Sequence, residues 1–204
     1  MTLQELVALL LLATAMSFTP GPNTTLSAAL AANCGLKAAL RFCCAVPAGW
    51  SVLMLICALG IGAVVMAMPA LRWGVKGVGV AYMLWLAWKL SQASRLGEAD
   101  RAALDIGFWQ GVMLQFVNIK AWMLALALSA GWVSGGAGAS PEHQDQRLLI
   151  VLAVMGVYAF VSNFTYALVG SLLREWLAQG RRLLWFNRTM AAVLVATAAW
   201  MTGV

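Results

Sequence analysis

The sequence predicts an all-α membrane protein in which six transmembrane helices form two inverted three-helix repeats. The first observation is composition: 63% of the 204 residues are hydrophobic and 10% are charged, whereas soluble domains are roughly 45–50% apolar and about 25% charged. The second is length, which allows six or seven spans of about 20 residues and no separate soluble domain. The third is that six spans divide into halves of three, so any repeat must be inverted in the membrane.

Six apolar segments follow one another along the chain. Repeat one covers about residues 2–92, a polar linker covers 93–107, and repeat two covers about 108–204. We expect the first segment to be a retained span, because it lacks the basic start and cleavage site of a signal peptide. The expected spans are residues 3–32, 40–68, 71–92, 108–133, 148–173 and 183–201.

The first span contains the sequence Thr19-Pro20-Gly21-Pro22 in its middle. Each proline removes a backbone donor and obstructs the preceding helical turn. Inside a membrane, freed backbone groups are tolerated only beside protein or a wet cavity. We therefore predict a helix broken from Thr19 to Pro22 around a polar cavity.

Two other spans carry proline or glycine. We expect Pro47 and Gly49 to interrupt the second span and Pro69 to end it. In the fifth span, Gly156 and Gly170 are fourteen residues apart on one helix face, which indicates close packing against a neighbouring helix.

Lys120 lies about half-way along the fourth span. A basic residue there costs roughly 2.5–3.5 kcal/mol on insertion scales and normally serves a pathway, a partner or a ligand. The alternative is a lysine that snorkels to the interface, but about a dozen residues separate it from either end of the span. All seven acids are terminal or in connections, so we expect an anionic group of a substrate to be its partner.

The second half of the broken first span complements this lysine. Gly21, Pro22 and Asn23 begin that half-helix, whose free amides and positive dipole end can receive a carboxylate. Further polar candidates are Asn163 and Tyr166 in the fifth span. Hydrogen bonding across a helix interface explains Asn163 equally well.

The basic residues predict the orientation of the spans. Connections on one side contain nine basic residues, and those on the other contain three. By the positive-inside rule, the connections after spans one, three and five are cytoplasmic and both termini are periplasmic. The nine are Lys37, Arg41, Lys89, Arg95, Arg101, Arg174, Arg181, Arg182 and Arg188; the three are Arg72, Lys76 and Arg147.

The cysteines and the single histidine have no metal-ligand spacing, and no cofactor is expected. A membrane thiol/disulfide electron-transfer protein that uses Cys43 and Cys44 is an alternative function. Adjacent cysteines form strained bridges, so small apolar packing is the better explanation. His143 is expected to be a solvated loop residue. The net charge of +6 comes without a basic patch or an RNA motif, so we expect no nucleic-acid partner.

These segments resemble the LysE/RhtB family of amino-acid exporters. The resemblance begins with residues 17–23 (Ser-Phe-Thr-Pro-Gly-Pro-Asn) and 34–39 (Cys-Gly-Leu-Lys-Ala-Ala). It continues with residues 79–90 of the third span, with residues 115–122, which resemble the family's Asn-Pro-Lys element, and with Asn187-Arg188. The resemblance covers nearly the whole chain in the right order.

The resemblance implies a six-span protein of the bacterial inner membrane that exports amino acids or related metabolites, driven by the proton gradient. Two positions depart from the family pattern. Ile119 replaces the usual proline, so we expect a less sharply broken fourth span than first. Trp50 follows Gly49 where members commonly carry an acid, which leaves proton coupling without an evident carboxylate. Both departures look closest to the branch that exports cysteine and O-acetylserine.

The sequence therefore predicts an exporter, not an enzyme, with its site where the first and fourth spans meet. Lys120 and the amides of Gly21–Asn23 would hold the substrate carboxylate, and Asn118, Asn163 and Tyr166 would bind the rest. The partners are an amino-acid-like substrate, the lipid bilayer, protons as a coupling ion and a second copy of the chain. A non-transporting scaffold in which Lys120 binds a lipid phosphate is a further alternative.

Overall fold

The computed structural model describes residues 1–93, 106–135 and 143–203, and every regular element in these ranges is a helix. The all-α prediction is confirmed. Most of the predicted linker and of the connection after the fourth span lie outside the described residues. The helices are α1 (Leu3–Phe18), α2 (Pro22–Cys34), α3 (Leu36–Ala58), α4 (Ile61–Ala67), α5 (Pro69–Gln92), α7 (Phe108–Val117), α8 (Ile119–Leu128), the π-helical segment η1 (Ser129–Ser134), α9 (Gln144–Leu172), α10 (Arg174–Leu177) and α11 (Arg182–Gly203).

Up to six membrane spans are present by length and composition. Helices α3, α9 and α11 are each long and apolar enough to cross a membrane alone. Three bent pairs qualify when each is taken as one span: α1 with α2, α4 with α5, and α7 with α8 and η1. The bends measure 49°, 90° and 71°. Large apolar side chains such as Leu11 and Val157 are exposed on the outside, where lipid would cover them.

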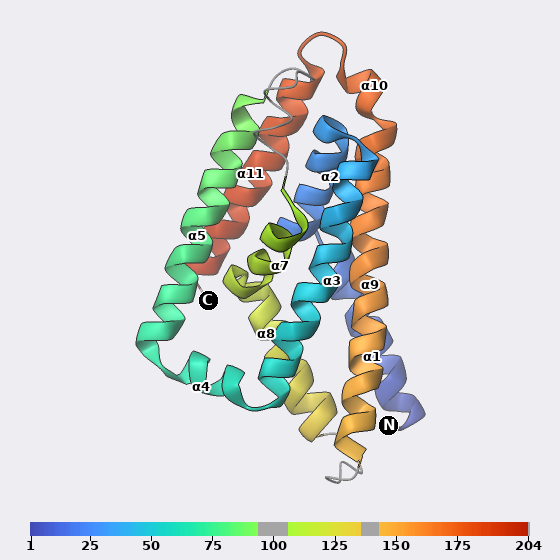
Figure 1. The fold of residues 1–204 in the computed structure, drawn as a ribbon, viewed down its shortest axis with the longest axis vertical. Helices are drawn as coiled ribbons and strands as arrows, with labels where there is room; N and C mark the ends of the chain where they lie inside the picture. Colours follow the sequence, from blue (N-terminus) through green and yellow to red (C-terminus); the bar gives the residue numbers. More distant parts are fainter. Residues whose placement is uncertain (94–105, 136–142, 204) are drawn as a thin grey trace.

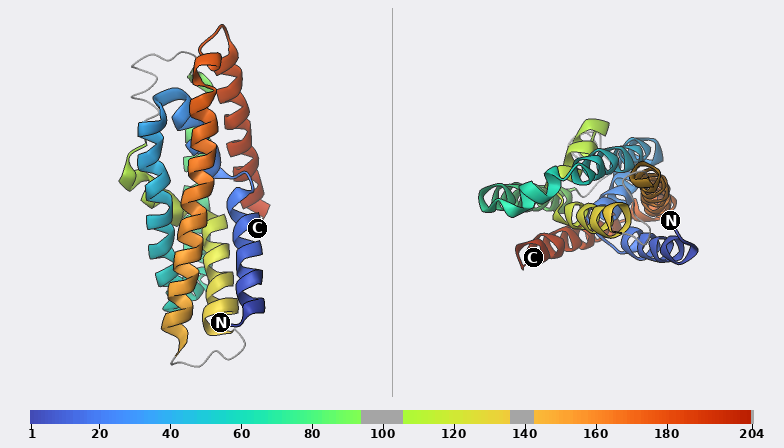
Figure 2. Two further views of the ribbon diagram at one scale, coloured as in Figure 1. Left: turned by 90° about the vertical axis from the view of Figure 1, so that its right-hand side faces the viewer. Right: turned by 90° about the horizontal axis from the view of Figure 1, so that it is seen from below.

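The spans alternate in direction (Figure 1). Helices α1, α2, α5 and α9 run toward the end of the molecule that holds α10, and α3, α7, α8 and α11 run away from it. The side view in Figure 2 shows the long helices standing roughly parallel. Helix α5 packs along α11, α9 packs on α2 and α3, and α3 packs on α7. The third and sixth spans are therefore neighbours, as are the first with the fifth and the second with the fourth.

The second span differs from the prediction. Helix α3 runs unbroken through Pro47 and Gly49 and ends at Ala58, about ten residues before the expected end. Gly60 then adopts the left-handed conformation (φ 80°), which favours glycine and reverses the chain into the short helix α4. Gly49 serves close packing: a Cβ at this position would lie 2.7 Å from the carbonyl oxygen of Val112 in α7.

The predicted glycine packing in the fifth span holds at one of its two positions. A Cβ at Gly170 would lie 2.2 Å from the carbonyl oxygen of Ala28, so α9 approaches α2 closely there. A Cβ at Gly156 would meet no atom within 4 Å. The same helix thus carries one glycine that the packing requires and one that it does not.

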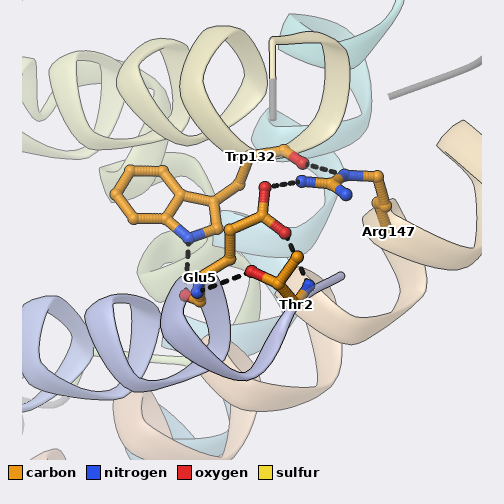
Figure 3. A network of polar contacts seen from close by, with 4 residues as sticks. All are labelled: Thr2, Glu5, Trp132 and Arg147. Carbon is orange, nitrogen blue, oxygen red and sulfur yellow. Dashed lines mark hydrogen bonds and ion pairs between the residues drawn. The ribbon is translucent and has the colours of Figure 1, made fainter. Parts of the chain in front are cut away.

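A buried ion pair closes the end of the bundle where the chain begins (Figure 3). Arg147 Nη2 lies 2.6 Å from Glu5 Oε1, and only 2% of the Arg147 side chain is exposed. Arg147 Nε also donates to the Trp132 carbonyl, and Trp132 Nε1 donates to the Glu5 carbonyl. The sequence analysis counted Arg147 as a loop charge, but it joins α9 to α1 and η1.

Two apolar clusters fill the interior. One contains residues of α2, α3, α5 and α11, such as Leu30, Phe42 and Leu194. The other contains residues of α1, α3, α8 and α9, such as Leu9 and Leu128. The breaks in the first and fourth spans fall between these clusters, so polar groups collect there.

Candidate functional site

The break in the first span lies where the sequence predicted it. Helix α1 ends at Phe18, and Pro22 occupies the first turn of α2, where its missing N–H removes no helical hydrogen bond. Thr19 closes α1 by donating its backbone N–H, over 3.2 Å, and its hydroxyl to the Ala15 carbonyl. Pro20 lies between the two helices.

Side chains from other spans satisfy two more carbonyls that the break frees. Lys120 Nζ donates to the Met16 carbonyl over 3.2 Å, and the Tyr166 hydroxyl donates to the Phe18 carbonyl over 3.0 Å. This is the internal satisfaction that an interrupted helix requires at membrane depth. The fourth and fifth spans therefore stabilise the break in the first.

The fourth span breaks at Asn118, between α7 and α8, without a proline. Asn118 caps α8: its side-chain oxygen accepts from the Lys120 N–H over 3.2 Å. Trp122 Nε1 donates to the Phe116 carbonyl over 2.8 Å. The bend is 71°, against 49° in the first span, so the prediction of a weaker break at Ile119 is wrong. The Asn118 cap and the Trp122 hydrogen bond therefore stabilise a helix break that was expected to need a proline.

The two breaks place Lys120 next to Gly21. A Cβ added at Gly21 would lie 3.6 Å from Lys120 Nζ. Gly21 has φ −164°, which any residue can adopt, so its small size matters here and not its flexibility. Among the described residues, Lys120 has no carboxylate partner. Its ammonium is half-buried and faces the start of α2.

The amides that are open to an anion differ slightly from those expected. The Gly21 N–H already donates to the Thr24 hydroxyl over 3.0 Å, and Pro22 has no N–H. The backbone amides of Asn23 and Thr24 have no acceptor in the described part of the chain. The anion-binding end of α2 therefore consists of these two amides.

A reciprocal amide pair joins the two breaks. Asn23 Nδ2 donates to Gln115 Oε1 over 2.9 Å, and Gln115 Nε2 donates to Asn23 Oδ1 over 3.2 Å. Gln115 is fully buried and also donates to the Gly111 carbonyl. The sequence analysis did not select Gln115 as a site residue, although a glutamine within a span was a visible signal.

The fifth span contributes Asn163, as predicted, and Ser162, which was missed. Asn163 Oδ1 accepts from the Ser27 hydroxyl over 2.8 Å, so this asparagine also fits the alternative of bonding between helices. Tyr166 does not line the cavity described below and is occupied with the Phe18 carbonyl.

These elements line a half-open cavity of about 80 Å³ at the level of both breaks, which is room for a few water molecules. Lys120 is the only charged residue among the described residues that line it. The lining residues are Met16, Ser17, Thr19, Gly21, Pro22, Asn23, Thr24, Val46, Trp50, Gln115, Asn118, Lys120, Ala121, Leu124, Met155, Ala159, Ser162 and Asn163.

Trp50 is a further lining residue that the sequence analysis did not anticipate as a site residue. Its side chain is 5% exposed, and its Nε1 has no hydrogen-bond partner among the described residues. Leaving a buried donor unpaired costs about 1–3 kcal/mol.

The cysteines do not support the redox alternative. All four are free thiols, and the adjacent Cys43 and Cys44 face different environments: Cys43 is buried and Cys44 is exposed. The Cys43 thiol lies 3.9 Å from the Ser27 hydroxyl. Consecutive residues of a helix do not face each other, and α3 is a regular helix there.

Comparison with known proteins shows the family of this chain. Residues 14–202 match the family model described as "LysE type translocator", and the chain belongs to that family. A relative from Salmonella choleraesuis named "Cysteine/O-acetylserine efflux protein" is 32% identical over 88% of this chain and 88% of its own length. Relatives with the same name from Escherichia coli K12 and Klebsiella pneumoniae are 31% and 29% identical over 88% of this chain, which corresponds to 88% and 87% of their lengths. No solved structure gives a significant match.

Proposed function

We propose that this protein exports an amino acid and binds its carboxylate between Lys120 and the first amides of α2. The observation that carries the proposal is the position of the Lys120 ammonium, 3.6 Å from where a Gly21 Cβ would lie, in a cavity without an acid among its described lining residues. An ammonium and a helix N-terminus that converge on one point form a carboxylate site. The remaining hydrogen bonds come from Asn118 and Asn163, and Tyr166 keeps the break open.

The names of the relatives narrow the substrate class. Each is an efflux protein for cysteine and O-acetylserine, which are small α-amino acids with uncharged side chains. The one charged residue among the described lining residues is the basic Lys120, which does not favour a cationic side chain. We therefore propose cysteine or O-acetylserine as the first substrates to test. The reaction is transport, with no chemical step.

The two halves of the chain support an alternating-access mechanism. The third span packs on the sixth, the first and second spans pack on the fifth, and the second packs on the fourth. Two inverted three-helix repeats are compatible with this arrangement. We propose that residues 2–92 rock against residues 108–203 about the cavity, in the bacterial inner membrane, with both termini periplasmic and the proton gradient as driving force.

Replacement of Lys120 by methionine tests the proposal. We expect Lys120→Met to abolish efflux of cysteine and O-acetylserine from cells, because the carboxylate loses its only cationic partner in the cavity, while membrane insertion continues. The matched control is Lys37→Met, because Lys37 is exposed and lies outside the cavity. Efflux is measured as loss of preloaded radiolabelled substrate. Undiminished efflux by Lys120→Met at wild-type expression would rule out the carboxylate site, and a non-transporting scaffold would show no efflux with any variant.

A further inference from the structure

An open groove lies at the end of the bundle where α10 leads into α11 (Figure 1). Its volume is about 420 Å³, and it shares no lining residue with the central cavity. Arg181 and Arg182 line it together with Trp176, Trp185 and Phe186. The groove therefore combines two cations with an aromatic wall.

Both arginines are available to an anion. Their side chains are exposed, and no carboxylate of the described chain forms an ion pair with either. Arg182 is also held in place, because its guanidinium lies 4.6 Å from the centre of the Trp176 ring and Nη1 donates to Gln179 Oε1 over 2.7 Å. Glu175, the acid of α10, does not line the groove. The two positive charges therefore have no compensating acid among the described lining residues.

The groove lies at a level where lipid headgroups are expected. Helix α11 is long and apolar enough to span a membrane, and residues 182–189 of its first two turns form one side of the groove. Trp176 and Trp185 are 53% and 59% exposed. Exposed tryptophans near the ends of spanning helices favour the headgroup region. This end is also the predicted cytoplasmic one, and the anionic lipids of the cytoplasmic leaflet attract basic segments.

We propose that this groove binds an anionic phospholipid. Arg181 and Arg182 hold its phosphodiester through charge-assisted hydrogen bonds, and the first methylenes of its acyl chains pack on Trp185 and Phe186. A free inorganic anion would leave this aromatic wall in water. A second copy of the chain, related by a two-fold axis through the groove, would bring its own arginines against these. A phospholipid satisfies both the cations and the aromatic wall.

Native mass spectrometry of the full chain in detergent tests the site. Phosphatidylglycerol and phosphatidylcholine with identical acyl chains are added at equal concentration, and the bound lipids are counted. The test variant combines Arg181→Gln with Arg182→Gln. The control combines Lys37→Gln with Arg72→Gln, which removes the same charge from two exposed residues outside the groove.

We expect the wild type to retain phosphatidylglycerol roughly 10-fold more strongly than phosphatidylcholine. This preference should be lost in the groove variant and kept in the control. An equal loss in both would mean a general electrostatic attraction, and no preference in the wild type would mean that no site exists. Displacement of the lipid by millimolar inorganic phosphate would mean a site for free anions. Each of these three results overturns the proposal.

Photolabelling gives a second measurement in the unaltered protein. The probe is a phosphatidylglycerol that carries a diazirine near the start of one acyl chain, and the protein is illuminated in proteoliposomes. Labelled peptides should include residues 176–189, and this labelling should fall in the arginine variant. Labelling confined to other segments contradicts the proposal. Cross-linking of residues 176–189 to a second copy of the chain would assign the groove to an interface between copies and would also overturn it.

Discussion

At the scale of single residues, the site depends on the space that Gly21 leaves open. Its extended backbone conformation is available to any residue, so glycine is not required for the turn. What glycine provides is room beside the Lys120 ammonium, where the proposed function places the substrate carboxylate. Steric and electrostatic roles are thus divided between two residues from different halves of the chain.

Enlarging residue 21 should therefore impair binding more than folding. We expect Gly21→Ala to raise KM moderately, because a methyl group at 3.6 Å from Lys120 Nζ is an ordinary contact. Gly21→Val should raise KM at least about 10-fold, because it fills the carboxylate position. KM is measured by concentration-dependent counterflow in proteoliposomes. Gly74→Val is the control, since a Cβ at Gly74 meets nothing within 4 Å; a similar KM change in both valine variants would refute the steric role of Gly21.

Most of the residues selected because a charge or a helix break stood out against an apolar background lie together in the structure, and their role in binding stays a prediction. Lys120, Asn118, Asn163 and residues 21–23 all line the cavity. Gln115 and Trp50 were missed because their importance depends on which helix face points inward and on which neighbours accept their hydrogens. Both features depend on the tertiary structure, and the hydropathy of a sequence window does not reveal them.

At the scale of helices, the two breaks reach similar geometry through different residues. The first uses Pro22 at the start of α2, and the fourth uses the Asn118 cap of α8. The sequence analysis treated proline as the cause of helix breaks. It therefore made two wrong predictions: a weaker break at Ile119 and an interruption at Pro47. Helix α3 nevertheless continues through Pro47. Membrane helices tolerate proline where neighbouring groups satisfy the freed backbone, and a single-sequence pattern does not reveal those neighbours.

A proline should be accepted at position 119 but not one turn later. Asn118 already has φ −94° and ψ 100°, close to the conformation that a following proline favours, and Ile119 is the first residue of α8. We expect Ile119→Pro to keep transport and to change the unfolding free energy by no more than about 1 kcal/mol. Met123→Pro, inside α8, should lose about 3 kcal/mol or more.

Thermal unfolding in detergent, followed by size-exclusion chromatography, distinguishes the two proline variants. Met123 is the appropriate comparison because it lies in the same helix and is 45% exposed, so little side-chain packing is lost. If Ile119→Pro unfolds as readily as Met123→Pro, the break at Asn118 is not the helix boundary that the structure indicates.

At the scale of the whole molecule, the orientation was predicted from the unequal number of basic residues on the two sides. The structure shows that fewer of those on the predicted periplasmic side are exposed than the sequence count suggests. Of the three basic residues on the predicted periplasmic side, Arg147 is paired with Glu5, and Lys76 is buried and donates to the Thr202 carbonyl over 3.0 Å. Only Arg72 is left exposed there. On the predicted cytoplasmic side, several basic residues are exposed, among them Lys37, Arg181, Arg182 and Arg188.

Reporter fusions should confirm this orientation. We expect a reporter inserted after Gly97 to be active in the cytoplasm and one inserted after Gly138 to be active in the periplasm, because exposed basic residues are retained inside. Alkaline phosphatase and green fluorescent protein serve as the two reporters. A cytoplasmic Gly138 would invert the assignment of both termini.

The general architecture was predictable because six apolar segments and an odd number of spans per half leave few arrangements. The pairing of the third span with the sixth, and the buried Glu5–Arg147 pair, were not predictable. Both depend on contacts between segments that are far apart in the sequence. The ion pair also carries no signal in composition, since each partner taken alone resembles an ordinary interfacial charge.

The single charge that the described residues bring to the cavity has an electrical consequence. A zwitterionic amino acid adds no net charge to a site whose lysine stays with the protein, so the loaded and the empty carrier bring the same charge into the membrane field. A voltage does about 2.3 kcal/mol of work per elementary charge per 100 mV, and only on charge that is moved across. Under the proposed function, the charges of the outward and return steps cancel, and carrying a zwitterion across the membrane moves no net charge per cycle. If an ion is coupled to the export, the net charge moved per cycle is the charge of that ion.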